Sequence, residues 1–178
     1  MRDGVVVITG VMASGKSTVA QLLAERLPRA AHVRGDAFRR MIVSGRREYA
    51  PGAGSDDEAT AQLHLRHRLS AAAADSYAEA GFTAVVQDVL LGERLTTYTG
   101  LIRTRPLYVV VLAPRPEAVA TREAGRPKTG YGAWTPVALD EELRLRTPRI
   151  GLWLDSSEWT PAETVDAILA GTERARLA

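Results

Sequence analysis

Cysteine is absent from the 178-residue sequence, which excludes disulfide bonds and zinc sites built on thiolates. No hydrophobic run approaches the roughly 18 residues of a membrane-spanning helix, so we expect no membrane partner. The apolar run at residues 5–8 leads directly into a glycine-rich motif, and we expect no signal peptide ahead of it. Together these absences favour a cytoplasmic protein.

Lysine is scarce, and the net charge is small. Only Lys16 and Lys128 are lysines among 23 basic residues, and 21 acidic residues leave a formal net charge of +2. No run of basic residues interleaved with aromatic ones is present, a pattern that is typical of nucleic-acid-binding surfaces. We therefore expect no nucleic-acid partner. A lysine in such an arginine-rich chain is a candidate for a chemical role.

Lys16 belongs to the motif Gly10-Val11-Met12-Ala13-Ser14-Gly15-Lys16-Ser17, which matches the P-loop pattern G-x-x-x-x-G-K-[ST]. The apolar run before it predicts a buried strand, and apolar residues at helical spacing after it predict a helix that ends near Leu27. We expect the loop and Thr18 to hold the phosphates of ATP. Lys16 would reach the β- and γ-phosphates, and Ser17 would bind Mg²⁺.

Strand and helix patterns alternate over the whole chain. Strands are predicted at residues 5–8, 31–34, 82–86, 107–112 and 150–154, and later helices at 37–43, 57–80, 93–103, 116–124, 136–146 and 161–169. This alternation predicts a single α/β domain over residues 1–178, a P-loop NTPase three-layer sandwich with a five-stranded parallel sheet between helices. Residues 46–57 are polar and rich in glycine and proline, and they predict a mobile loop.

Ligands of open parallel sheets bind at the carboxyl ends of the strands, so residues there are candidates. Asp36 follows the second strand; it could bind or deprotonate a substrate hydroxyl, or cap the next helix. Asp88 ends the third strand; it could hold Mg²⁺, contact the substrate, or face solvent. Arg115 and Ser156 follow the fourth and fifth strands, where the base of ATP would bind.

A short basic lid is predicted at about residues 115–134. Arg122 and Arg126 would close over the transferred phosphoryl group, with Lys128 a weaker candidate and a solvated loop the alternative. Around Asp36 lie three arginines that could hold an anionic part of a substrate: Arg34, Arg39 and Arg40. His64 and His67 have a spacing that could share a metal, but no third ligand is evident, so a solvated helix face is expected.

Four motifs together resemble the small P-loop kinases. They are the P-loop, Gly35-Asp36, Val86-Gln87-Asp88-Val89-Leu90-Leu91-Gly92 and Arg122-Glu123-x-x-Arg126, each after a predicted strand. The pattern is similar to gluconate, shikimate and adenylylsulfate kinases, and most of all to chloramphenicol phosphotransferases, which carry a second acid where this chain has Gln87. The resemblance implies that Asp36 acts as base toward the acceptor hydroxyl, and that Arg122 and Arg126 contact ATP phosphates.

The sequence thus predicts an ATP- and Mg²⁺-dependent kinase that phosphorylates a hydroxyl of a small molecule, as a monomer or homodimer. An antibiotic and a sugar-like metabolite are both open as acceptors. One alternative is a nucleoside or nucleotide kinase, in which Tyr131 or Trp134 would stack on a base. Another is an ATPase or switch that acts through a protein partner, although the chain has no N-K-x-D guanine motif and no interaction tail.

Overall fold

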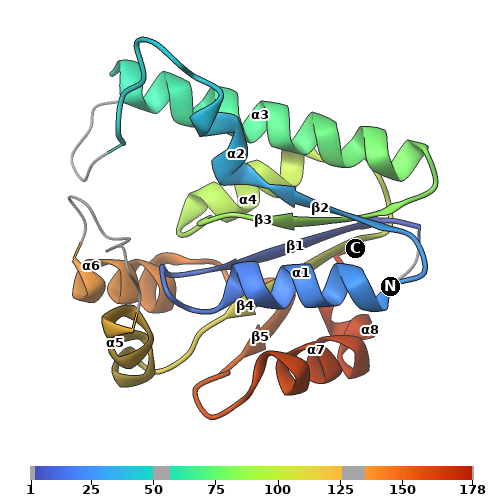
Figure 1. Ribbon diagram of the computed structural model, residues 1–178, viewed down its shortest axis with the longest axis vertical. Helices are drawn as coiled ribbons and strands as arrows, with labels where there is room; N and C mark the ends of the chain where they lie inside the picture. The colour runs from blue at the N-terminus through green and yellow to red at the C-terminus, as the bar shows by residue number, and fades with distance from the viewer. Residues whose placement is uncertain (1–2, 50–56, 126–134, 178) are drawn as a thin grey trace.

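The computed structural model describes residues 3–49, 57–125 and 135–177. One parallel sheet organises them, and its strands are β1 (Val5–Gly10), β2 (Ala30–Arg34), β3 (Thr83–Gln87), β4 (Leu107–Leu112) and β5 (Leu152–Leu154). The strand order is β2-β3-β1-β4-β5, so the strand that leads into the P-loop lies at the centre (Figure 1). The predicted five-stranded α/β fold is confirmed.

Helices connect and cover these strands. They are α1 (Lys16–Arg26), α2 (Gly35–Arg40), α3 (Glu58–Glu79), α4 (Glu93–Leu101), α5 (Pro116–Ala124), α6 (Pro136–Glu141), a π-helical turn η1 (Glu142–Arg146), α7 (Pro161–Ala170) and α8 (Thr172–Ala175). The prediction of a helix at 37–43 is wrong at both ends, because α2 begins at Gly35 and ends at Arg40. The predicted helix at 136–146 divides into α6 and η1, and α8 was not predicted.

Side-chain alternation along β1 separates the core into two layers. Val6 and Ile8 pack in a cluster with apolar residues of α1, α7 and α8, whereas Val5 and Val7 pack with those of α3 and α4. Successive residues of a strand point to opposite faces, and here both faces are covered by helices, as Figure 1 shows. This explains why β1 is a continuous apolar run, as strands of parallel sheets buried on both faces usually are.

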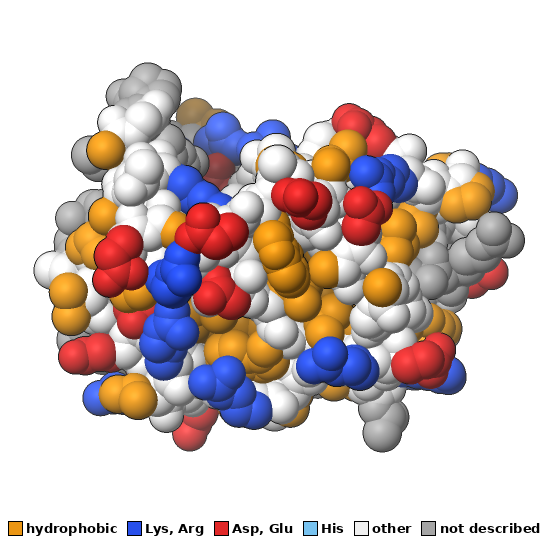
Figure 2. All heavy atoms as spheres, turned by 90° about the horizontal axis from the view of Figure 1, so that it is seen from below, with side chains coloured by type: hydrophobic (Ala, Val, Ile, Leu, Met, Phe, Trp, Pro, Cys, Tyr) orange, Lys and Arg blue, Asp and Glu red, His pale blue; other side chains and the backbone are white. Residues whose placement is uncertain are grey.

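The surface carries mixed charge. Figure 2 shows one face of the molecule, on which acidic and basic side chains are interspersed among apolar ones. Such a mixture gives no extended field of one sign over the described residues of that face. No described helix has the length and apolar character that a membrane span requires. The expected absence of a nucleic-acid partner stays a prediction.

Candidate active site

The P-loop joins the central strand to α1 through an unusual backbone path. Gly10 has φ 151°, and a Cβ there would lie 2.5 Å from the carbonyl oxygen of Leu112, so no side chain fits. Ala13 and Gly15 have φ 58° and 91°. α1 then begins at Lys16, without a side-chain cap and without an acidic residue in its first turn. The positive end of α1 therefore points at the loop, which suits a phosphate group.

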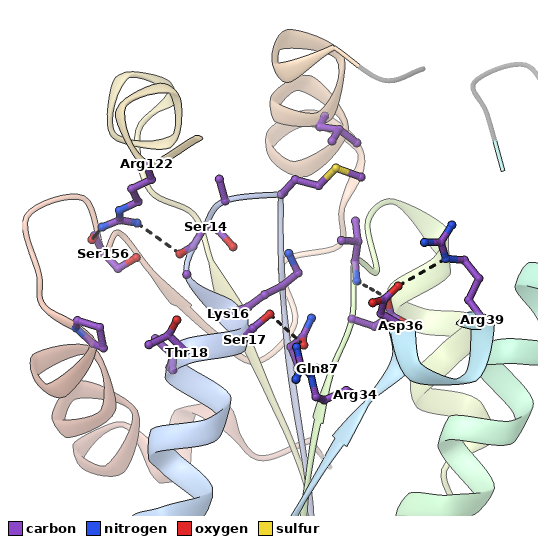
Figure 3. Close-up of a pocket in the computed structure, with 18 of the residues that line it drawn as sticks. Ser14, Lys16, Ser17, Thr18, Arg34, Asp36, Arg39, Gln87, Arg122 and Ser156 are labelled. Atoms are coloured by element: carbon purple, nitrogen blue, oxygen red, sulfur yellow. Dashed lines mark hydrogen bonds and ion pairs between the residues drawn. The ribbon is translucent and has the colours of Figure 1, made fainter. Parts of the chain in front are cut away.

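Two P-loop side chains, Lys16 and Ser17, line the cavity and make hydrogen bonds within the site. Lys16 is a buried residue, and its Nζ donates a hydrogen bond to the carbonyl oxygen of Val11 at 2.9 Å. Ser17 Oγ donates to Oε1 of Gln87 at 3.1 Å (Figure 3). Gln87 ends β3, which pairs with β1, and the sheet thus delivers its amide to the P-loop. Ser17 and Gln87 together offer two oxygen atoms on the side where a metal is expected.

Asp88 is held by an arginine that the sequence analysis did not single out. Its carboxylate is buried; Arg66 of α3 donates to Oδ2 from Nε at 2.8 Å and to Oδ1 from Nη2, and the Val89 N–H donates to Oδ1 at 2.7 Å. Gly35 packs against the other side of the carboxyl group. The solvent-facing alternative for Asp88 is therefore wrong. Nothing in the α3 pattern distinguished Arg66 from the other charged residues of that helix.

Asp36 lies in the first turn of α2, with its side chain available to the cavity. The N-cap of this helix is Arg34, which makes no side-chain cap bond, so the carboxylate of Asp36 is not consumed as a cap. It pairs instead with Arg40 at 2.9 Å, and with Arg39 at 3.5 Å as Figure 3 shows. Arg39 also binds Glu48. Of the three candidate arginines, Arg34 and Arg39 are among the residues that line the cavity, whereas Arg40 is not.

A cavity of about 1020 Å³ joins these groups. At one end it is lined by the P-loop, Arg122, Ser156, Trp159, Pro161 and Thr164; at the other by Arg34, Asp36, Arg39, Glu48, Tyr49, Leu63, Arg66, Asp88 and Arg94. Lys16 and Ser17 lie between Asp36 and Arg122 (Figure 3). A nucleotide at the first end would direct its terminal phosphate toward the second, where an acceptor would bind.

Arg122 ties the predicted lid to the nucleotide end. Its guanidinium donates to the carbonyl oxygens of Ser156 at 2.6 Å, Ser157 at 3.3 Å and Ser14 at 3.4 Å (Figure 3). The Oγ atoms of Ser14 and Ser156 are buried and have no hydrogen-bond partner among the described residues. Hydroxyls in this state fit a polar ligand, which would satisfy them. Arg126, Lys128, Tyr131 and Trp134 lie outside the described residues.

Two histidines on α3 differ in their surroundings. His64 is exposed, as predicted, but His67 is only 3% exposed and its ring lies edge-on to Tyr98 at 5.5 Å. The expected solvated face is therefore wrong for His67. Burial, together with the positive charges of Arg66, His64 and Arg94, lowers the pKa of His67 to about 3. Over residues 3–49, 57–125 and 135–177, no three histidine, cysteine or acidic side chains are grouped as metal ligands would be.

Comparison with known proteins identifies the family of this chain and proteins that share its fold. A family model described as an AAA domain matches residues 5–144, from β1 into η1. A sugar kinase from Janibacter sp. has a similar structure, with a TM-score of 0.69 and 20% identity over 96% of this chain and 95% of that one. An APS kinase from Mycobacterium tuberculosis, solved with AMPPNP and APS, gives 0.67 and 20% over 97% and 98%.

A third similar structure is a tunicamycin resistance protein from Deinococcus radiodurans, with a TM-score of 0.63 and 16% identity over 98% of each chain. No curated protein sequence matches this chain. The three structures show a shared P-loop kinase fold over nearly the whole length. One is a sugar kinase, one an APS kinase and one a tunicamycin resistance protein, so the shared fold leaves the acceptor of this chain open.

Proposed function

Since the chain belongs to the AAA domain family, we propose that it is a kinase that transfers the γ-phosphoryl group of ATP to a hydroxyl of a small molecule. One observation carries the proposal: Lys16 and Ser17 line the same cavity as Asp36. A phosphate-binding loop and a carboxylate at opposite ends of one cavity suit phosphoryl transfer to an oxygen acceptor. A sugar-like metabolite or an antibiotic would fit this chemistry.

The nucleotide end suits ATP with Mg²⁺. The loop amides, Lys16 and the buried hydroxyls of Ser14 and Ser156 would bind the nucleotide, since the two hydroxyls have no partner within the described chain. Ser17 and Gln87 offer oxygen ligands, and Mg²⁺ commonly completes its shell with substrate phosphates and water. When bound, the metal would neutralise charge on the phosphates. Gln87, rather than Asp88, would then be the partner of Ser17 in holding the metal, because Asp88 is bound by Arg66.

The acceptor end supplies the base. Asp36 would accept the proton of the acceptor hydroxyl and later release it to water. The acceptor oxygen then forms a bond to the γ-phosphorus, while the bond from that phosphorus to the β–γ bridging oxygen breaks and ADP leaves. Arg122, which contacts the P-loop at Ser14, would stabilise charge on the phosphates, and Arg126 would join it. Asp88 would act on the acceptor side, by holding Arg66.

The test is ATP consumption with product mass, against a panel of sugars, hydroxylated antibiotics and nucleosides. We expect Lys16→Ala to abolish turnover and Asp36→Asn to lower it at least about 100-fold, the usual scale for a general base. Asp166→Asn is the matched control, because Asp166 is exposed on α7 and only pairs with Arg26. Near-normal turnover by Asp36→Asn would show that Asp36 is not the base that accepts the proton of the acceptor hydroxyl. ATP loss without a phosphorylated product would favour the ATPase or switch.

A further inference from the structure

The two edges of the sheet differ in how well they are protected from pairing with another strand. β5 forms one edge and has only three residues, whereas β2 forms the other and has five. Natural proteins often block such edges with lysine, proline or a bulge, yet residues 30–33 contain neither lysine nor proline and pair with β3 without a bulge. β2 lies between α1 and α3 (Figure 1), and no strand in the described parts of the chain pairs with its outer side. This edge is therefore open to another strand.

The outer side of β2 presents an ordered set of backbone groups. The carbonyl oxygen of Arg29 accepts from the N–H of Thr83 at 2.9 Å, and Ala30 lies opposite Thr83 in the register with β3. In such a ladder, alternate residues of β2 direct their backbone groups to β3, and the residues between them direct theirs away. The C=O of Ala30, both groups of His32 and the N–H of Arg34 therefore point away from the sheet.

Opposite charges lie at the two ends of this edge. A groove of about 430 Å³ is lined by α1 and β2, with Glu25, His32 and Arg34 among its residues. Arg34 lies beside Ser17 at the start of α1 (Figure 3), and Glu25 follows Ser17 by about 12 Å along the helix. Because α1 runs antiparallel to β2, and β2 spans about 13 Å from Arg34 back to Ala30, Glu25 lies near the Ala30 end. Over the described residues, no carboxylate pairs with Arg34 and no basic side chain with Glu25.

The middle of the edge is neutral. The Nδ1 atom of His32 lies 2.8 Å from Oε1 of Gln21, and since an amide oxygen accepts, Nδ1 carries the proton. Gln21 also donates to Oε1 of Glu25 at 2.9 Å. Burial, together with the positive charge of Arg34, lowers the pKa of His32. At pH 7 the ring is therefore uncharged, and two such rings can lie close together without repulsion.

We propose that β2 pairs with β2 of a second copy of this chain, antiparallel and about a two-fold axis at His32. This pairing sets His32 opposite His32 and Ala30 opposite Arg34, so that the outward N–H and C=O groups of each strand meet those of the other. It also brings Arg34 of each copy to Glu25 of the other, twice in one interface. A strand of another protein could bind the backbone groups, but the charges at this edge match a second copy. The homodimer does not depend on the proposed kinase function.

The first experiment measures mass by sedimentation velocity, from micromolar to millimolar protein. We expect the wild type to approach twice the 19.2 kDa mass of one chain as the concentration rises. His32→Pro should raise the dissociation constant at least about tenfold, because it removes one outward N–H from each copy at an edge position that tolerates proline. His32→Val is the matched control, since valine keeps the N–H and suits a strand. A wild type that stays monomeric at millimolar concentration, or a dimer unaffected by His32→Pro, would overturn the inference.

The second experiment exchanges the charges of the edge. Glu25→Arg should raise the dissociation constant about tenfold or more, because it sets two arginines side by side in each half of the interface. The combination of Glu25→Arg with Arg34→Glu restores the attraction, and it should return the constant to within about threefold of the wild type. Glu173→Arg is the control, since it makes the same charge change on α8, which packs on β4 and β5. No recovery in the double variant would show that Arg34 and Glu25 do not meet across the axis.

Amide hydrogen exchange locates the interface. The N–H groups of His32 and Arg34 point away from β3, and their exchange should slow about tenfold or more when the concentration is raised to the point where the dimer predominates. The N–H of Val33 points to β3 and should change less. A dimer in which the amides of His32 and Arg34 exchange as fast as in the monomer would use another surface, and the inference would be wrong.

Discussion

Gly35 is a single residue on which the geometry of the acceptor end depends. It begins α2 directly against Asp88, and an added Cβ would overlap Oδ2 and lie 2.6 Å from the carboxyl carbon. Asp88 cannot move aside easily, because its carboxylate is buried and bound by Arg66. The absence of a side chain at Gly35 is therefore what allows β2, β3 and α3 to meet here.

We predict that Gly35→Ala lowers the free energy of unfolding by about 2 kcal/mol, as insertion of an extra group into a packed site commonly does. Gly100→Ala is the control, since Gly100 lies inside α4 with nothing within 4 Å of an added Cβ. There, alanine should stabilise by about 0.5–1 kcal/mol through its helix propensity. Urea denaturation measures both. Equal stability of Gly35→Ala and the wild type would mean that the ion pair between Asp88 and Arg66 can move to make room for the added methyl group.

The residues that could be predicted from sequence differ in kind from those that could not. Lys16 and Ser17 belong to a motif with fixed spacing, and Asp36 directly follows a recognisable strand. Arg66 and Arg94 are on helices whose patterns give no sign of a site, and they reach the cavity only because α3 and α4 pack on the same sheet face. Local patterns carry local information, whereas these contacts depend on the tertiary arrangement.

At the scale of elements, the segment between α2 and α3 is held by side-chain contacts that the sequence did not indicate. A mobile loop was predicted at 46–57, which stays a prediction, and in the described part of this segment the side chain of Gln62 binds the backbone at two points. Its Nε2 donates to the carbonyl oxygen of Gly45, and its Oε1 accepts from the N–H of Arg47, both at 2.9 Å. Glu48 and Tyr49 are held by Arg39 and Arg94. These contacts place the segment at the acceptor end of the cavity.

We predict that Gln62→Leu speeds amide hydrogen exchange at Arg47 about fivefold to tenfold, since the net contribution of one such hydrogen bond is about 1 kcal/mol. The KM for the acceptor should rise, whereas the KM for ATP should not. Gln21→Leu is the control, because Gln21 is exposed on α1 and contacts Glu25 and His32. Unchanged exchange at Arg47 in Gln62→Leu would mean that other contacts hold the segment.

The turn η1 shows why the extent of a helix was easier to predict than its type. Helical residues were correctly placed at 136–146, but the last five form a π-helical turn. Thr147 Oγ1 donates to the carbonyl oxygen of Glu142 at 2.9 Å and accepts from the N–H of Gly92 at 2.8 Å. The turn thus depends on a contact with Gly92, the distant N-cap residue of α4, which the periodicity of residues 136–146 does not contain.

For the molecule as a whole, the sequence predicts the fold class well because five apolar runs alternate with helices. It did not reveal the strand order β2-β3-β1-β4-β5, which requires β2 and β3 to pair although α2 and α3 separate them in the chain. Nor did it reveal that His67 would be on the buried side of α3, against Tyr98 of α4. Because burial disfavours the protonated ring of His67, it makes the stability of the fold depend on pH.

The free energy of unfolding should depend on pH through His67. The pKa of this ring is about 3 in the folded protein and about 6.5 in an unfolded chain. Between these values the unfolded state binds a proton that the folded state does not, so stability is complete above pH 6.5 and declines as the pH falls. The slope is up to about 1.4 kcal/mol per pH unit.

Urea denaturation at pH 7 and pH 5 checks this dependence. On acidification the wild type should lose about 2 kcal/mol more than His67→Leu, because leucine does not titrate. The comparison is between pH-dependent losses, so the packing change against Tyr98 cancels between the two pH values. His64→Leu, on the exposed face of the same helix, should retain the wild-type dependence on His67. Equal losses in the wild type and His67→Leu would mean that the folded protein accommodates a charged imidazole on the buried side of α3.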